Sequence, residues 1–413
     1  MPAIFVTYSL AYLDRANYGF GAAAGLAKTL QISDSRSAFL GSLFFLGYLL
    51  FQMPGAAYAQ RKSATKLVFF ALLSWGALAA FTGVIRQFWL LALDRLLLGV
   101  AESIIFPSML ILLTKWFTRA ERSRANAIFI LGNPVTLLWM SAVTGFLIKA
   151  VGWQMTFVLE GLPSIVWAFV WALIVRDRPQ EASWLSKDCC EKLESEFERE
   201  QNALPRIVNF RAALRMPGVM LLCLNYFFWS AGVYGFVLWL PTMIRMGSSR
   251  GIEAVGLMNA APFLFAIMLM LGVAHFSDRT LSRKRFVWPF LGISGIALFI
   301  SFMTAAHSFW LAYAFLIVGG GTMFAPYGPF FSIVPEMLPK NVAGQMLAFI
   351  NSCGALGGFV GTWSVGFLQA VTGNSRAGYF LMSMSLLLAG AFIFALGNPK
   401  PETNQECPAK MLC

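Results

Sequence analysis

Residues 176–215, RDRPQEASWLSKDCCEKLESEFEREQNALPRIVNFRAALR, form the one long polar stretch in a chain of 413 residues. The rest of the sequence is unusually apolar: 58% of the residues are hydrophobic, 12% are charged, and the mean hydropathy is +0.68. Globular domains carry about 25% charged residues, roughly twice that share. The composition therefore predicts a membrane protein, which the polar stretch divides into two parts.

Apolar runs long enough to cross a membrane lie on both sides of this stretch. A hydrocarbon core about 30 Å thick requires about 20 helical residues at about 1.5 Å each, whereas barrel strands would be about half as long and alternate in polarity. Six runs precede the polar stretch and six follow it. They lie near residues 3–27, 36–58, 66–86, 88–116, 124–148, 153–176, 218–244, 251–275, 285–306, 308–334, 342–370 and 377–397. We expect an all-α membrane protein with twelve transmembrane helices.

The predicted domains are two six-helix bundles, at residues 1–176 and 218–397, with a cytoplasmic central loop at 177–217 and a cytoplasmic tail at 398–413. A faint internal repeat supports the division, because AYAQRKSATK (57–66) and HFSDRTLSRKR (275–285) follow the second and eighth runs. Carriers built from two parallel repeats bind their substrate between the halves, near the membrane midplane. The sequence predicts a site in that position.

Glycine and proline indicate how two of the helices pack. The run NSCGALGGFVG (351–361) spaces its glycines as small-xxx-small pairs, which favour close approach of two helices in lipid. Gly132, Asn133 and Pro134 are expected to interrupt the fifth helix, since proline lacks the N–H that the helix requires.

Basic residues set the orientation. They concentrate in every second loop, around Arg61, Lys115 and Arg279, so the positive-inside rule places both termini in the cytoplasm. The net charge of +12 thus indicates topology, and nucleic acid is excluded as a partner.

The first run has no basic leader and is expected to be a retained span of a bacterial inner membrane protein. The six cysteines show no ligand spacing and are expected to be reduced, with no metal and no cofactor.

Six ionisable residues interrupt the apolar runs. A charge at the bilayer centre costs about 3 kcal/mol unless it finds a partner or water, so each one is a candidate for function. Two helices carry most of them, near the midplane, and can bring an acid and a base each into one polar cluster. The residues are Asp14 and Arg15 within AYLDRANYGF (11–20), then Asp94, Arg95, Glu102 and Glu160.

This cluster has the groups needed to bind an anion and a proton. Arg15 offers a permanent charge on a planar fork that matches a carboxylate. Tyr8 and Tyr12 share its helical face, and Tyr48 and Gln52 share a face of the second helix. The alternative is a set of structural salt bridges, in which Asp94 would neutralise Arg95. Glu160 fits that structural interpretation best, and the acidic cluster at 191–200 fits a solvated loop helix.

Three motifs carry a resemblance to a known family. YLDRANYGF (12–20), LDRLLLGVAESIIFPS (93–108) and LEGLPS (159–164) resemble the anion:cation symporter branch of the major facilitator superfamily, which includes hexonate and hexuronate carriers. The resemblance covers essentially the whole chain and implies alternating access with proton-coupled uptake of an organic anion. It implies proton coupling by Asp14, Glu102 and Arg95. It implies substrate contacts at Arg15, Tyr12, Tyr48, Asn133, Phe331, Ser332 and Asn351, and gating contacts at Arg61, Asp278 and Arg279.

The chain departs from that branch in three places. Gln60 stands where the superfamily's loop signature has an acid before its arginine, which would weaken the gating contact on that side. Asn133 and Phe331 stand where sugar-acid carriers often have glutamine and tryptophan. These changes leave the handling of an anion intact and make its identity less certain.

The sequence as a whole predicts a monomeric secondary transporter that couples protons to a small organic anion, such as a sugar acid. An aromatic or other monocarboxylate is the alternative substrate, because Tyr226, Trp229 and Phe330 are also candidates for the pocket. Export or facilitated diffusion, and a non-transporting receptor or scaffold with the same fold, also remain open. No nucleophile with a base, metal cluster or phosphate loop is evident, so an enzyme is not expected.

Overall fold

A computed structural model describes residues 1–117, 119–182, 214–280, 282–337, 340–372 and 377–396, with residues 185, 186, 191, 194 and 195. Most of the central acidic cluster and the tail at 398–413 lie outside these ranges.

Every regular element in the described residues is a helix. The first half contains α1 (Pro2–Ala23), α2 (Leu26–Thr29), α3 (Asp34–Arg61), α4 (Ala64–Thr82), α5 (Phe88–Ser103), α6 (Ile105–Trp116) and α7 (Arg119–Ile174). The second contains α10 (Pro217–Ser248), α11 (Ile252–Thr280), α12 (Trp288–Thr304), α13 (Phe309–Phe324), α14 (Tyr327–Met337), α15 (Lys340–Thr372) and α16 (Ala377–Ala395).

The expected membrane crossings are present in these helices. By length and composition, ten helical segments of the described chain can cross a membrane, and one of them, Ile128–Ile174, has 47 residues. That segment holds two crossings, because Gly152 (φ 80°, ψ 164°) turns the chain inside α7 at the boundary expected between two runs. Helix α1, with 22 residues, supplies the crossing that contains Asp14 and Arg15. The twelve-helix prediction is confirmed.

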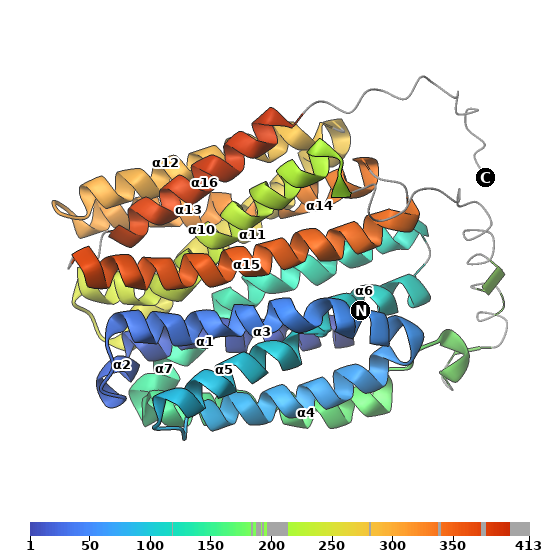
Figure 1. Cartoon of the computed structure of the whole chain (residues 1–413), viewed down its shortest axis with the longest axis horizontal. Coiled ribbons are helices and arrows are strands. Elements are labelled where there is room, and N and C mark those ends of the chain that lie inside the picture. Colours follow the sequence, from blue (N-terminus) through green and yellow to red (C-terminus); the bar gives the residue numbers. More distant parts are fainter. Residues whose placement is uncertain are drawn as a thin grey trace.

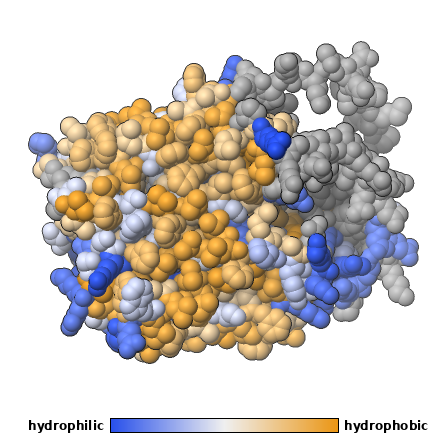
Figure 2. Space-filling view, in the orientation of Figure 1, coloured by the Kyte–Doolittle hydropathy of each residue, from blue (hydrophilic) through white to orange (hydrophobic). Residues whose placement is uncertain are grey.

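The surface of the helices suits a lipid environment. Large apolar side chains point outward along the helices, and Phe70, Val166 and Leu271 are 62%, 63% and 58% exposed. Figure 2 shows hydrophobic residues covering the centre of one face and hydrophilic residues gathered toward its two ends. Such a band would aggregate in water, so it matches the expectation of a membrane protein.

The two halves lie next to each other, and their helices run roughly along the long axis of the molecule (Figure 1). Three helix pairs join them: α3 with α15, α7 with α11, and α1 with α10. We call the end that holds Met1 the Met1 end, and the end that holds Ala23, Lys149 and Glu253 the Lys149 end.

Close glycine contacts fix the packing within the second half. A Cβ added at Gly357 of α15 would lie 2.0 Å from Phe227 O of α10, and one added at Gly361 would lie 2.3 Å from Ala231 O. Only glycine permits this approach of two backbones. The small-residue packing expected for 351–361 is therefore confirmed. At Gly132–Pro134 the helix continues, since the non-helical backbone angles of α7 are at Gly152, and a bend at Pro134 stays a prediction.

An acidic side chain ties the end of α7 to the start of α4. Asp177 Oδ1 accepts from Thr65 N at 3.1 Å, and its Oδ2 accepts from the hydroxyl of Ser63, the N-cap of α4. These bonds satisfy groups that a helix N-terminus leaves without partners.

We expect Asp177→Ala to lower the free energy of unfolding by about 1–2 kcal/mol, because two bonds to a charged acceptor are lost. Thermal unfolding of the purified protein in detergent measures this. Asp34→Ala is the control, since Asp34 is an exposed acid in the first turn of α3 and should contribute only about 0.3–1 kcal/mol through the helix dipole. Equal losses of unfolding free energy from the two substitutions would contradict the proposed link between α7 and α4 through Asp177.

Candidate functional site

A pocket lies between the two halves, with about 560 Å³ of unfilled space, part of it open to solvent. Helices α1, α3, α6 and α7 line one side, and α10, α14 and α15 line the other. Six of the predicted substrate residues are at its wall: Tyr12, Arg15, Tyr48, Asn133, Phe331 and Asn351.

Arg15 provides the positive charge of this pocket. Its side chain reaches across to Glu102 at the end of α5, where Nε donates to Oε2 at 2.9 Å and both side chains are buried. The guanidinium also lies over three aromatic rings, 4.8 Å from the centroid of Tyr12, 4.7 Å from that of Tyr48 and 5.5 Å from that of Phe44. Such cation–π contacts hold the group in place. The fork therefore has a fixed position at the pocket wall.

The Arg15–Glu102 pair leaves hydrogen-bonding capacity unused. Arg15 Nη2 and Glu102 Oε1 are both buried and have no hydrogen-bond partner among the described residues. A buried donor without a partner costs about 1–3 kcal/mol, so an acceptor would gain by satisfying Nη2 if the side chains around it moved aside. A carboxylate, with two oxygens in the plane of the guanidinium, has the geometry to do so.

The polar groups of the pocket come from both halves. From the first half, Asn133 contributes an amide whose Oδ1 is buried and without a partner in the described chain. Tyr8 donates to the Tyr12 hydroxyl at 3.5 Å. From the second half come Ser230, Tyr234 and Tyr327. The sequence did not single out these three, although the first two share one face of α10 with Tyr226 at four-residue spacing.

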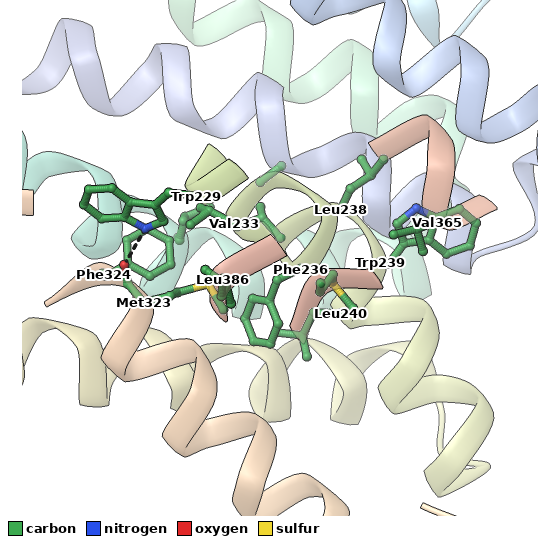
Figure 3. Packing of buried hydrophobic residues seen from close by; sticks show 14 of the residues in the cluster. Trp229, Val233, Phe236, Leu238, Trp239, Leu240, Met323, Phe324, Val365 and Leu386 are labelled. Carbon is green, nitrogen blue, oxygen red and sulfur yellow. Dashed lines mark hydrogen bonds between the residues drawn. The ribbon is translucent and has the colours of Figure 1, made fainter. Parts of the chain in front are cut away.

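Aromatic rings form much of the wall on the second half. Tyr226 stacks on Phe330 at 5.3 Å between centroids, and Tyr327 stacks on Phe331 at 6.2 Å. Trp229 supports this wall from behind: its ring lies 4.5 Å from that of Tyr327, and its Nε1 donates to Met323 O at 2.9 Å (Figure 3). The rings are thus held in place by the packing of α10 against α13 and α14.

Arg95 and Asp94 do not pair with each other. Asp94 Oδ2 instead accepts from Thr82 Oγ1 at 2.6 Å. Arg95 is 1% exposed and lies over the ring of Tyr18 at 4.7 Å, and no ion pair within 4.0 Å is found for it in the described residues. It lies behind the pocket wall, within electrostatic range of Asp14 and Glu102. The described residues show no ion pair within 4.0 Å between Asp94 and Arg95, although Asp94 acts on Arg95 at longer range as Glu102 and Asp14 do.

Asp14 faces away from the pocket. Its Oδ1 accepts from Asn17 Nδ2 at 3.4 Å, and the same nitrogen donates to Glu160 Oε2 of α7 at 3.3 Å. Glu160 Oε1 accepts from Thr144 Oγ1 at 2.5 Å. The two neighbouring charges of AYLDRANYGF therefore belong to two separate polar clusters. Asn17, inside that same motif, was missed by the sequence analysis.

The remaining predicted residues lie elsewhere. Gln52 is buried and accepts from Ser352 Oγ at 3.1 Å, so it joins α3 to α15 across the two halves and does not line the pocket. Ser332 donates to Gly328 O at 3.0 Å within its own helix. Arg61 and Arg279 are exposed, and the side chain of Asp278 lies outside the described residues. Their gating role stays a prediction.

The halves touch directly at the Lys149 end. Lys149 Nζ donates to Glu253 Oε1 at 2.8 Å, and Asn259 Nδ2 of α11 donates to Ser141 Oγ of α7 at 2.8 Å. Between these contacts, a Cβ added at Gly256 would lie 2.5 Å from Ser141 O. These contacts hold α7 against α11 at the Lys149 end.

No group of three or more histidine, cysteine, aspartate or glutamate residues in the described part of the chain is placed to hold a metal ion. The chemistry that the pocket offers is the binding of an anion by an arginine, beside a carboxyl group that competes for the same arginine.

Comparison with known proteins gives consistent matches. The model of the Major Facilitator Superfamily matches residues 4–362. A protein of Acinetobacter baumannii named "Quinolone resistance transporter" is 30% identical over 94% of this chain and 90% of its own. A protein of Agrobacterium vitis named "Putative tartrate transporter" is 31% identical over 97% of this chain and 94% of its own length. A bacterial homologue of the human lysosomal transporter Spinster, solved in an inward-facing and occupied conformation, superposes with a TM-score of 0.76 at 17% identity, covering 95% of both chains.

Proposed function

The chain belongs to the Major Facilitator Superfamily and is a transporter, and from this premise we propose that it carries a small organic anion by proton-coupled symport. The observation that supports the proposal is the state of Arg15. Arg15 lines the pocket between the two halves, donates from Nε to Glu102, and has a second buried nitrogen, Nη2, without a partner among the described residues.

Competition for Arg15 provides a coupling mechanism. An ionised Glu102 holds the guanidinium and weakens the binding of a second anion, because the positive charge is already neutralised. When Glu102 takes up a proton, the pair loses its charge attraction and the whole fork becomes available to the substrate carboxylate. Release of that proton on the other side restores the pair and expels the anion. Loaded and empty carriers would then each avoid an unpaired buried charge.

The substrate we propose is a small hydroxylated carboxylate, such as tartrate or a sugar acid. Tyrosine hydroxyls and the amides of Asn133 and Asn351 surround Arg15, and they can donate to or accept from ligand hydroxyls. The name of the Agrobacterium vitis relative agrees with this class. An aromatic carboxylate is the second candidate, favoured by the rings of Tyr226 and Phe331 on the opposite wall, with Phe330 stacked on Tyr226 behind them.

We further propose that the Met1 end faces the cytoplasm and that the chain works as a monomer in a bacterial inner membrane. The basic residues near Arg61, Lys115 and Arg279 support this orientation. The Lys149 end would then be the outer end, and the contacts that hold α7 against α11 there would help to shut the outer route.

The experiment that tests the function is uptake into proteoliposomes of three labelled probes: L-tartrate, D-gluconate and 4-hydroxyphenylacetate. We expect one of the first two to accumulate when the proton gradient is directed inward, and not to accumulate when the gradient is collapsed. Accumulation of 4-hydroxyphenylacetate alone would favour the aromatic candidate. If none of the three accumulates, the proposal is wrong for this substrate class, and export or facilitated diffusion becomes the better explanation.

Glu102→Gln is expected to abolish gradient-driven accumulation of the transported probe while exchange of internal for external probe continues. A glutamine can still accept a hydrogen bond from Arg15, but it cannot take up and release a proton. Both activities are measured in the same proteoliposomes. Glu181→Gln is the control, because Glu181 is an exposed acid outside the helices that line the pocket. Normal accumulation by the Glu102 variant would remove Glu102 from the coupling mechanism.

A further inference from the structure

A second buried acid cluster lies between α1 and α7, behind the wall of the pocket. Asp14, Asn17 and Glu160 are 1%, 1% and 4% exposed. One amide nitrogen of Asn17 serves both carboxyl groups, at 3.4 Å from Asp14 Oδ1 and 3.3 Å from Glu160 Oε2. The two acids are therefore close together in a site that water does not reach.

The cations nearby do not neutralise this cluster. Arg15 pairs with Glu102, and no ion pair within 4.0 Å to Asp14 or Glu160 is found in the described residues. Arg95 acts on Asp14 and Glu102 at longer range, whereas the side chains that act on Glu160 in the described residues are the neutral Thr144 and Asn17. The donors that face the two carboxyl groups in the described residues are neutral: the amide of Asn17, the hydroxyl of Thr144 and the indole of Trp75. Two ionised carboxylates there would bring two buried like charges together, which is strongly unfavourable.

From this arrangement we propose that Asp14 and Glu160 form a second proton site, in which Glu160 holds the proton and Asp14 is ionised toward Arg95. Glu160 Oε1 lies 2.5 Å from the hydroxyl oxygen of Thr144, and a hydroxyl can accept as well as donate, so this oxygen can bear the proton. The geometry assigns to Glu160 a role that its sequence position did not indicate.

The site is linked to the pocket by two routes. Asp14 and Arg15 are neighbours on α1 and point about 100° apart, so a rotation of α1 at the pocket also displaces Asp14 and Asn17. Arg95 lies in electrostatic range of both Asp14 and Glu102, so a change of charge at one acid is felt by the other. The part that Glu160 takes in coupling rests on the proposed function, whereas the presence of its proton does not.

Infrared spectroscopy of the substrate-free protein tests the proton directly. A protonated carboxyl group absorbs above the amide band, and we expect part of this absorption to be lost in Glu160→Gln at neutral pH. Asp14→Asn is expected to keep it, because Glu160 then remains without a cation. Glu253→Gln is the control, since Glu253 is paired with Lys149 at the surface and should not contribute. An unchanged band in a folded Glu160→Gln protein would overturn the proposal.

Thr144→Val provides a second variant if Glu160→Gln fails to fold. It removes the hydroxyl beside Glu160 Oε1 and should shift the acid absorption to higher frequency without abolishing it, because a free carboxyl group has a stiffer C=O bond. No shift in this variant would equally count against a proton on Glu160.

Transport tests the role of the site in coupling. One coupled proton supports about a tenfold concentration ratio for a gradient of about one pH unit. With L-tartrate as probe, we expect Glu160→Gln to lower the accumulation ratio about tenfold while exchange is retained. Normal accumulation together with a lost infrared band would make Glu160 a static acid, which would overturn its role in coupling. If the wild type carries no probe, the proposed function fails and the infrared result still decides on the proton.

Discussion

Replacing Arg15 by alanine is expected to abolish uptake of the transported anion and to destabilise the protein by about 3–5 kcal/mol. The loss of stability follows because Glu102 would remain buried without the partner that now donates to it at 2.9 Å. The loss of uptake follows because no other cation lines the described wall of the pocket. Thermal unfolding in detergent and proteoliposome uptake measure the two effects separately.

A double variant separates the two roles of Arg15. Arg15→Ala combined with Glu102→Gln removes the orphaned charge, so most of the stability should return while uptake stays absent. Arg15→Lys should retain a positive charge but lose the planar fork, and we expect weaker binding with partial stability. Uptake by the double variant would show that the substrate anion is held by another group.

Replacing Gly256 by alanine is expected to open the Lys149 end. The added Cβ would lie 2.5 Å from Ser141 O and 3.1 Å from Gly145 Cα, so α11 can no longer pack against α7. Overpacking of this kind costs about 1–3 kcal/mol, which shifts the balance between closed and open forms by roughly 5–150-fold. We expect uptake to fall accordingly, because alternating access requires this end to close.

Labelling measures the shift. A cysteine at Ser141, which is buried where the halves meet, should react faster with a membrane-impermeant maleimide when Gly256→Ala is present. Gly272→Ala is the matched control on the same helix, since an added Cβ there has nothing within 4 Å. Equal labelling in the two backgrounds would mean that the contact between α7 and α11 does not govern access.

The helices and the charged centre could be predicted from the sequence because both depend on local chemistry. Apolar run length fixes the crossings, and the cost of a charge in lipid marks Asp14, Arg15 and Glu102 as residues that need partners. Even the turn between two crossings inside α7 falls at Gly152, where one apolar run gives way to the next.

The grouping of those charges could not be predicted, because it depends on the rotation of each helix about its own axis. On α1 that rotation is fixed by contacts distant in sequence, such as Gly19, where a Cβ would lie 2.3 Å from Leu238 O. This packing turns Arg15 toward the pocket and Asp14 toward Glu160. The same limit explains Gln52, whose helical face matched that of Tyr48 but which bonds to Ser352 between the halves.

The two tyrosine rings around Arg15 bear on what selects the substrate. A free arginine side chain loses up to about 2 kcal/mol of conformational entropy when it is immobilised, but here the rings of Tyr12 and Tyr48 have already restricted it. Binding the first carboxylate therefore costs little ordering, and it costs equally little for every anion. Differences in affinity must then arise at the other end of the ligand. We therefore expect selectivity to depend on the distance between the carboxylate bound at Arg15 and the ligand group that contacts the opposite wall of the pocket.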